Sequence, residues 1–216
     1  MSIQVMLQQL SGGMVTTIMI FTLTLIFSLP LGLVISFGRM SPHFLIKNIT
    51  KIYISLMRGT PLMLQLLVVY FGPFFLLGIN ITSNYRVYAV IIAFVINYAA
   101  YFAEIYRGGM ESMPAGQKEA AKVLGYSKSQ TFFKITLPQV IKRILPSITN
   151  EVITLVKDTS LAFSIACAEM FTIAKSLAAS QKSMVPLVAA AVFYYIFNFM
   201  VASLMEYWEK KMNHYH

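Results

Sequence analysis

Long stretches without charged residues alternate with short charged segments along this chain. No Asp, Glu, Lys or Arg occurs in residues 1–38, 59–85, 87–103 or 183–205. A membrane-spanning helix needs about 20 predominantly apolar residues, and shorter ones occur, so each stretch can supply a span. The pattern therefore predicts an all-α membrane protein that crosses the bilayer several times.

We predict five spans within one transmembrane domain that covers residues 1–216. The spans are residues 14–38, 55–77, 86–106, 147–168 and 185–207. Composition agrees with this class, because 57% of the residues are hydrophobic and only 12% are charged, about half the charged fraction of a soluble domain. Soluble enzymes and nucleic-acid-binding domains are thereby excluded.

The basic residues indicate the orientation. Thirteen of the 17 Lys and Arg residues lie in residues 39–58, residues 107–143 and the tail after residue 207. Segments rich in Lys and Arg stay in the cytoplasm, so we expect the N-terminus outside and the C-terminus in the cytoplasm. The net charge of +9 is thus a topology signal, and we expect no nucleic-acid partner.

Neither a metal site nor a catalytic group is expected. The chain has one cysteine, Cys167, and three histidines, His43, His214 and His216, with no cluster of ligands around them. No basic residue precedes Arg39, so the charged start of a cleavable signal peptide is missing. We expect the first apolar stretch to be retained as a span.

Residues 108–146 form the longest predicted cytoplasmic segment. Helix-forming residues 117–124 end at Gly125, which suits the position after a helix C-terminus, and Ser127 with Gln130 has capping-box spacing. We therefore expect two short helices, the second ending near Pro138. From composition alone, the segment either lies flat on lipid headgroups or docks on another protein.

One motif in this segment separates these alternatives. The residues that carry it are Glu119, Ala120, Ala121, Gly125, Ile135, Leu137 and Pro138. Their order and spacing resemble the EAA signature of ABC importer permeases. The resemblance implies a coupling helix, within a coupling segment of residues 112–140, that docks into a groove on a separate ATPase subunit. The chain itself has no G-x-x-x-x-G-K-[ST] loop for phosphates, so ATP and Mg belong to that partner.

Three further motifs resemble the polar amino acid branch of these permeases, including its histidine, glutamate, glutamine, arginine and cystine types. They are Arg58-Gly59-Thr60-Pro61-Leu62 with Gln65, Ala103-Glu104 with Arg107, and Lys157-Asp158-Thr159-Ser160-Leu161. The resemblance covers essentially the whole chain. It implies a type I importer fold in a prokaryotic cytoplasmic membrane, with a second identical or related permease, two ATPases and an extracellular or periplasmic substrate-binding protein.

The residues also allow a purely structural interpretation of these motifs. Thr60 suits an N-cap and Pro61 the first position of a helix in span two, which places Arg58 at the cytoplasmic interface. Glu104 and Arg107 are spaced to pair on one helix, and Arg58 is an alternative partner for Glu104. Interfacial anchoring and helix-end pairing explain these residues without a transport role.

Span four is unusually polar. Its polar residues Asn150, Glu151, Thr154, Lys157, Asp158, Ser160 and Ser164 fall within about half of the helix circumference. Ionisable residues inside a span usually face a cavity, so we expect this stripe to line a substrate pathway or a subunit interface.

A free amino acid carries one ammonium and one carboxylate. Our hypothesis is that Glu151 or Asp158 binds the ammonium and Lys157 the carboxylate, with Thr154, Ser160, Gln65 and Glu169 also on the pathway. Purely structural pairing of these charges is the alternative. Competing functions are an ABC importer for another small solute, or a non-ABC channel or membrane scaffold that would need no ATPase.

Overall fold

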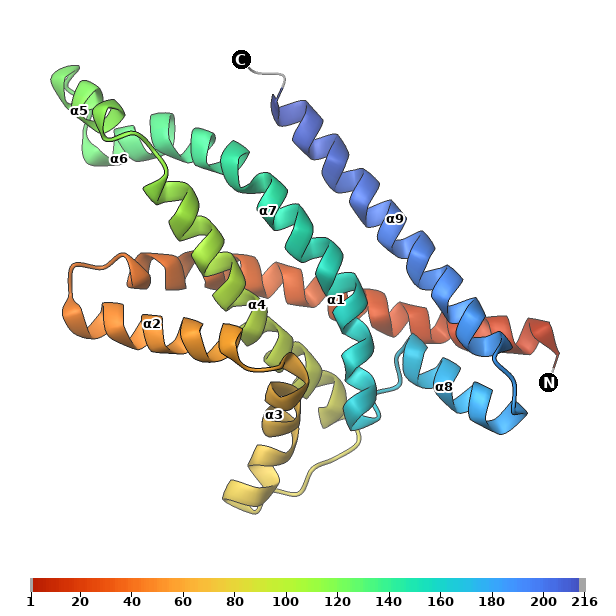
Figure 1. Ribbon diagram of the computed structural model, residues 1–216. Helices are drawn as coiled ribbons and strands as arrows, with labels where there is room; N and C mark the ends of the chain where they lie inside the picture. Colours follow the sequence, from red (N-terminus) through yellow and green to blue (C-terminus); the bar gives the residue numbers. More distant parts are fainter. Residues whose placement is uncertain (1, 214–216) are drawn as a thin grey trace.

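The computed structural model describes residues 2–213, which fold as helices joined by short turns (Figure 1). The helices are α1 (Ile3–Arg39), α2 (Phe44–Gly59), α3 (Leu62–Leu77), α4 (Tyr85–Glu111), α5 (Ala115–Val123), α6 (Lys128–Thr131), α7 (Leu137–Asp158), α8 (Met170–Gln181) and α9 (Val185–Asn213). A π-helical segment, Phe132–Thr136, joins α6 to α7, and a 3-10 segment, Thr159–Ile165, follows α7.

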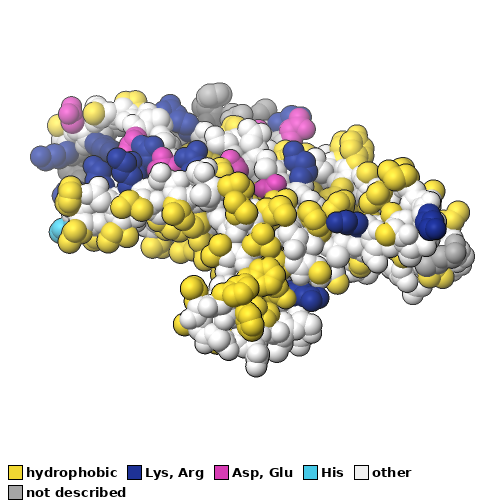
Figure 2. Space-filling model, turned by 60° about the horizontal axis from the view of Figure 1, so that its bottom comes forward, with side chains coloured by type: hydrophobic (Ala, Val, Ile, Leu, Met, Phe, Trp, Pro, Cys, Tyr) yellow, Lys and Arg dark blue, Asp and Glu magenta, His cyan; other side chains and the backbone are white. Residues whose placement is uncertain are grey.

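Three of these helices, α1, α4 and α9, are long and apolar enough to cross a membrane. Two further spans are counted if each of two bent helix pairs makes one, which gives three to five candidate spans within the described residues. Side chains support this placement, since hydrophobic residues are spread widely over the face shown in Figure 2, while most of the Lys and Arg on that face gather toward one end. The predicted all-helical membrane class is therefore confirmed.

Helix α1 holds the molecule together through close contacts at small residues. It begins at Ile3, well before the predicted start of span one, and its 37 residues extend about 55 Å. A Cβ added at Gly32 would lie 2.8 Å from Phe102 Cβ and 2.9 Å from the Ala99 carbonyl of α4. Small residues permit such backbone contact between membrane helices, so α1 and α4 cross closely here.

Span two is broken, which corrects the prediction of one continuous helix over residues 55–77. Helices α2 and α3 meet at an angle of 109°. The capping prediction is also wrong by one residue, because Pro61 occupies the N-cap position of α3. Thr60 instead ends α2, where its hydroxyl donates to the Leu56 carbonyl at 2.8 Å. Pro61 cannot continue a helix and restricts the residue before it, so the break falls at this point.

Two amides fix the bend between α2 and α3. Gln65 Nε2 donates to the Met57 carbonyl at 2.9 Å and to Thr60 Oγ1 at 2.8 Å. Asn97 Nδ2 of α4 donates to the same Met57 carbonyl at 3.0 Å and to Gln65 Oε1 at 2.9 Å. Carbonyls freed at the broken helix are thereby satisfied inside the protein, as a low-dielectric environment requires.

The predicted helix–turn–helix of residues 112–140 is present at one tip of the molecule (Figure 1). Gly125 has φ +77°, and the amides of Gly125 and Tyr126 donate to the Lys122 and Ala121 carbonyls. This is the Schellman pattern of hydrogen bonds that favours glycine. Ser127 and Gln130 form the predicted capping box.

The second helix of this segment does not end near Pro138, contrary to the prediction. The chain remains helical from Lys128 to Ile165. A π turn over Phe132–Thr136 precedes Pro138, and the Leu137 amide donates to the Phe132 carbonyl, five residues back. The wider turn accommodates the missing N–H and the bulk of the proline ring, so α6 and α7 form one bent rod.

A turn and a short helix after α7 were not predicted. Ala166 adopts a left-handed conformation with φ 53°, and α8 then runs at 56° to the preceding rod. Helix α8 packs between α1 and α9, around the buried side chains Leu10, Met170 and Ala174. Helix α4 is the most enclosed helix, with Phe94, Tyr98 and Phe102 fully or almost fully buried.

Candidate functional site: a polar seam between two helices

Helices α4 and α7 run antiparallel, and hydrogen bonds at two points fix their register. Tyr98 OH donates to Asp158 Oδ2 at 2.7 Å. Fourteen residues further along α4, Arg143 of α7 donates from Nη1 to the Ser112 carbonyl at 2.6 Å and to Ser112 Oγ at 2.9 Å. The seam between these two points is about 22 Å long, which is most of the thickness of a bilayer core.

The polar stripe of α7 follows this seam. Glu151 and Asp158 are half-buried, whereas Thr154 and Lys157 are exposed. The hydroxyls of Thr154 and Ser160 donate to carbonyls of their own helix, Asn150 and Lys157. The two carboxylates therefore face the space beside α4, and the lysine lies on the flank of the stripe.

Arg58 adds a cation to the same seam. Its guanidinium lies over the ring of Tyr101 with 5.2 Å between Cζ and the ring centroid. Tyr101 in turn lies beside Tyr98, with 6.2 Å between the ring centroids. Arg58 lies in the last turn of α2, directly before the break in span two, and is exposed in the single subunit.

The predicted pairing of Glu104 with Arg107 is present, with 2.6 Å between Arg107 Nη2 and Glu104 Oε2. Arg107 also pairs with Glu111, and Arg39 of α1 lies 3.6 Å from Glu104. The cross-helix partner of Glu104 is therefore Arg39, while Arg58 lies outside the 4 Å ion-pair distance in the described chain. This network marks the α5 end of the seam.

Two residues expected on the pathway are held in structural positions. Gln65 uses its amide at the α2–α3 bend. Glu169 is completely buried and caps α8, accepting from the Phe171 and Thr172 amides at 2.8 and 2.7 Å. It also accepts from Tyr194 OH at 2.9 Å. Glu169 therefore does not open to an outer mouth in this conformation.

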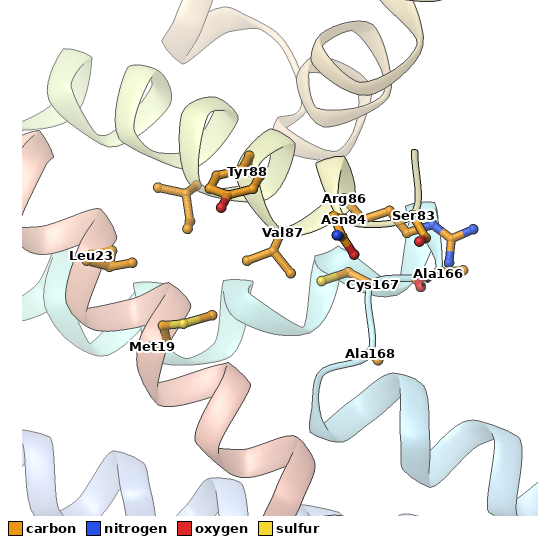
Figure 3. A pocket seen from close by; sticks show the side chains of 11 residues that line it. Met19, Leu23, Ser83, Asn84, Arg86, Val87, Tyr88, Ala166, Cys167 and Ala168 are labelled. Carbon is orange, nitrogen blue, oxygen red and sulfur yellow. Dashed lines mark hydrogen bonds between the residues drawn. The ribbon is translucent and has the colours of Figure 1, made fainter. Parts of the chain in front are cut away.

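Two hollows lie near the seam. One, of about 340 Å³, is lined by Glu104, Ser112, Arg143 and Ser147 at the α5 end. The other, of about 510 Å³, lies between α1, the first turns of α4 and the turn at Ala166. Met19 and Leu23 line one side of it, with Cys167 on another side (Figure 3). The pathway residues expected from the sequence do not line this second hollow.

The hairpin of α5 and α6 presents apolar residues to the surface. Val123 is 87% exposed, Leu124 73% and Phe133 64%, and Glu119 is exposed beside them. Its base is fixed to α7, because Gln117 and Gln139 exchange amide hydrogen bonds of 3.0 and 3.1 Å. A protruding unit with an apolar tip and a rigid base suits a docking element.

Sequence reasoning missed the tyrosines of the seam and the contact of Arg58 with Tyr101. Tyr98 and Tyr101 looked like ordinary aromatic residues of a span, and only the antiparallel register brings Tyr98 to Asp158. A signal for Arg58 was present, since Gly59-Thr60-Pro61 can break a helix, and discontinuous helices commonly line substrate sites in membrane transporters.

The chain combines membrane-length helices and a polar seam with a protruding hairpin whose tip is apolar. Residues 28–214 match the family described as binding-protein-dependent transport system inner membrane component. The chain is 36% identical over 209 residues to the L-cystine transport system permease protein TcyB of Bacillus subtilis, covering 95% of this chain and 87% of the relative. It is 35% identical over 201 residues to the arginine transport system permease protein ArtQ of the same organism, covering 93% and 90%.

Solved structures agree with these relatives. A crystal structure of an amino acid ABC transporter with histidines superposes with a TM-score of 0.86 at 29% identity, covering 98% of this chain and 99% of that one. An inward-facing MetNI methionine ABC transporter, with a TM-score of 0.74 and 16% identity over the same shares of the two chains, shares the fold.

The chain therefore belongs to the family of inner membrane components of binding-protein-dependent transport systems. It is the multi-pass permease subunit of a bacterial ABC importer, in the branch of permeases for polar amino acids. It is a transport subunit rather than an enzyme, and ATP hydrolysis belongs to its ATPase partners.

Proposed function

We propose that this permease imports a polar amino acid through the α4–α7 seam by alternating access. The observation that carries the proposal is a polar track with charges of both signs inside membrane helices, formed by Arg58, Tyr98, Glu151, Lys157 and Asp158. Ionisable residues at such positions usually serve a pathway. The relatives that transport L-cystine and arginine support a substrate with both an ammonium and a carboxylate.

In the proposed topology the N-terminus is outside and the C-terminus is cytoplasmic, with the bent pairs α2–α3 and α7–α8 each counted as one span. The support is the placement of basic residues at the α5 end of the molecule, which the positive-inside rule assigns to the cytoplasm. The α5–α6 hairpin then projects toward ATPase subunits, and the turn at Ala166 faces the substrate-binding protein outside.

Two permease subunits are proposed to enclose the pathway. Thr154 and Lys157 are exposed in the single subunit, although they lie at the level of the Tyr98–Asp158 hydrogen bond within the predicted span. Lipid tails cannot solvate a lysine. A second permease, identical or related, would cover this face and leave a polar path between the subunits.

The acidic and basic side chains of the seam are proposed to bind opposite ends of the substrate. Asp158, oriented by the Tyr98 hydroxyl, and Glu151 bind the ammonium group, while Lys157 on the flank attracts the carboxylate end. Thr154 and Ser160 line the same face. Charge-assisted hydrogen bonds of this kind are roughly twice as strong as neutral ones, so they suit recognition of a zwitterion.

The proposed ATPase-coupling element consists of Glu119, Ala120, Ala121, Gly125, Ile135, Leu137 and Pro138. The exposed tip residues Val123 and Leu124 would enter a groove on the ATPase. The paired amides of Gln117 and Gln139 would transmit its movement to α7. Because α7 carries Glu151 and Asp158, closure of the ATPases would reshape the substrate seam directly, and the two states would differ in substrate affinity.

The proposal is tested by uptake of labelled L-cystine, L-arginine and L-glutamine in cells with and without this gene, alongside ATP-depleted cells. The expected result is loss of ATP-dependent uptake of at least one of them on deletion, with recovery on complementation. Unchanged uptake of all three, in cells that lack every related system, would reject the amino acid assignment.

A matched pair of variants locates the site in the same assay. We expect Asp158→Asn to lower uptake at least tenfold, because the charge that binds the ammonium is removed. Glu206→Gln is the control, since Glu206 is an exposed carboxylate on α9 that pairs with Lys210. Equal uptake by the two variants would remove Asp158 from the pathway.

A further inference from the structure

Arg58 occupies an unusual place for an arginine in this membrane protein. It ends α2 just before the break in span two and lies against Tyr101 of α4. Tyr101 is ten residues from the α5 end of α4 and 16 from its other end, or about 15 Å and 24 Å along the helix. The Arg58 charge is thus about one turn further into the seam than Glu104.

The hydrogen-bonding capacity of Arg58 is unused within residues 2–213. Arg58 is exposed in the single subunit, and the described residues give its guanidinium no hydrogen bond and no carboxylate within 4 Å, while its charge lies over the face of Tyr101. A guanidinium carries five N–H donors in a planar fork. Stacking on an aromatic face holds this plane in position and leaves the N–H edge free.

The other arginines near the seam each have a polar partner in the described chain. Arg107 pairs with Glu104 and Glu111, and Arg143 donates to Ser112. Arg39 lies 3.6 Å from Glu104. Among the arginines around α4 and α7, Arg58 therefore combines a fixed orientation with free donors in the described structure.

The surroundings of Arg58 match one end of a zwitterion. Glu151 and Asp158 are half-buried carboxylates two turns apart on α7, so negative charge continues along the seam. Tyr98 and Tyr101, in contact with each other, connect the Arg58 position to the Asp158 position along α4. An α-carboxylate at Arg58 would direct the ammonium of the same molecule toward the acidic side chains.

We propose that Arg58 is the residue that binds the substrate carboxylate, through the bidentate fork that a lysine cannot provide. This inference rests on the proposed amino acid transport and refines it, because Lys157 then supplies attraction while Arg58 makes the directional contact. It also gives the break in span two a function. The break leaves Arg58 in the last turn of α2, against Tyr101 of α4.

The test measures direct binding to the purified permease–ATPase complex in lipid nanodiscs without a substrate-binding protein, whose own specificity would otherwise intervene. L-Arginine is compared with agmatine, L-cystine with cystamine, and L-glutamine with 4-aminobutanamide. The second compound of each pair lacks the α-carboxylate of the first, and cystamine lacks both carboxylates of cystine. The wild-type complex is expected to bind at least one acid tenfold or more tightly than its decarboxylated analogue.

Arg58→Gln is expected to remove this preference, so that the acid binds about as weakly as the analogue, whose own affinity stays unchanged. Arg58→Lys should restore part of the preference. Arg86→Gln is the matched control, because Arg86 lies at the far end of α4 against Tyr70 and Ala166, and it should retain the full preference. Unchanged analogue binding shows that the variants are folded.

The outcomes separate the two proposals. If the acids bind the wild-type complex and Arg58→Gln keeps their tenfold advantage, the inference about Arg58 is wrong while amino acid transport stands. If Lys157→Gln alone abolishes the preference, the carboxylate contact belongs to Lys157 and the inference is likewise overturned. If none of the three acids binds and none is taken up, the proposed function fails and this inference fails with it.

Discussion

At the scale of single residues, Glu169 shows how one buried carboxylate can organise several elements. Its two oxygens accept from the Phe171 and Thr172 amides, the Thr172 and Tyr194 hydroxyls and, at 3.5 Å, the Thr17 hydroxyl. These groups belong to α1, α8 and α9. The carboxylate thus replaces water for donors that would otherwise be buried without a partner.

We predict that Glu169→Ala lowers the thermal stability of the purified complex strongly, because it leaves several buried donors unsatisfied at a cost of about 3 kcal/mol or more. Glu169→Gln should cost less, since one amide oxygen still accepts. Thermal unfolding in detergent measures both. Glu206→Gln is the exposed control and should not shift the transition. Equal stability of Glu169→Ala and wild type would contradict the structural role.

Local partners were predictable from the sequence, whereas distant partners were not. Glu104–Arg107 and Ser127–Gln130 are three residues apart, and helical spacing alone pairs them. In contrast, 152 positions separate Glu169 from Thr17, and 60 positions separate Tyr98 from Asp158. Those pairs depend on how helices cross, which the hydrophobic pattern leaves open.

At the scale of elements, the α5–α6 hairpin depends on the left-handed conformation of Gly125. We predict that Gly125→Ala destabilises the turn by about 1 kcal/mol and weakens association with the ATPase several-fold. Gly116→Ala is the control within the same hairpin, because a Cβ there has open space around it in the described structure and Gly116 has no positive φ. It should associate as well as wild type or better.

Co-purification of tagged ATPase with each variant, at matched expression, measures this association. Equal loss in both glycine variants would indicate that bulk at the hairpin, rather than the turn conformation, matters. Equal retention would show that Gly125 is not required for docking.

The bend between α2 and α3 gives a second prediction at this scale. Gln65→Leu and Asn97→Leu should each destabilise the subunit by about 1–3 kcal/mol, because each leaves the Met57 carbonyl or the other amide short of a partner. The double variant should cost clearly less than the sum, since both side chains act in one network. Thermal unfolding of the wild type, both single variants and the double variant gives the double-mutant cycle. Additive losses would contradict the shared network.

The bend also shows why the sequence predicted the existence of span two but not its break. The charge-free run of residues 59–85 predicts a span, and its hydrophobicity is the same whether the helix is straight or broken. The π turn before Pro138 has the same origin, because proline favours an end to a helix and tertiary packing of Val140 and Ile144 against Met113 favours continuation. Packing decides such conflicts, and packing is not visible in a single sequence.

At the scale of the whole molecule, α1 and α4 form the crossing on which the seam depends. We predict that Gly32→Val forces the two helices apart, at a cost of about 1–3 kcal/mol, because its side chain would overlap Phe102 and the Ala99 carbonyl. Gly12→Val on the same helix has open space in the described structure and serves as the control. A lower unfolding temperature for Gly32→Val alone, measured in detergent, is the expected result.

The last prediction concerns the route from ATPase to substrate. Helices α5 and α7 meet through the reciprocal amides of Gln117 and Gln139, and α7 extends from that contact to Asp158. If this contact transmits the movement of the coupling hairpin, Gln117→Ala should let the ATPase dock and hydrolyse ATP while transport per ATP falls several-fold. The relevant measurement is uptake and ATP hydrolysis on the same proteoliposomes.

Gln139→Ala should have the same effect, and the double variant should add little, because both substitutions remove one contact. Gln130→Ala, which removes only one side of the capping box at the hairpin, is the control and should keep the ratio of transport to hydrolysis. A proportional fall of uptake and hydrolysis in the Gln117 and Gln139 variants would mean that they weaken docking instead. An unchanged ratio in both would show that the movement reaches α7 through the π turn, which is the covalent connection from the hairpin to α7.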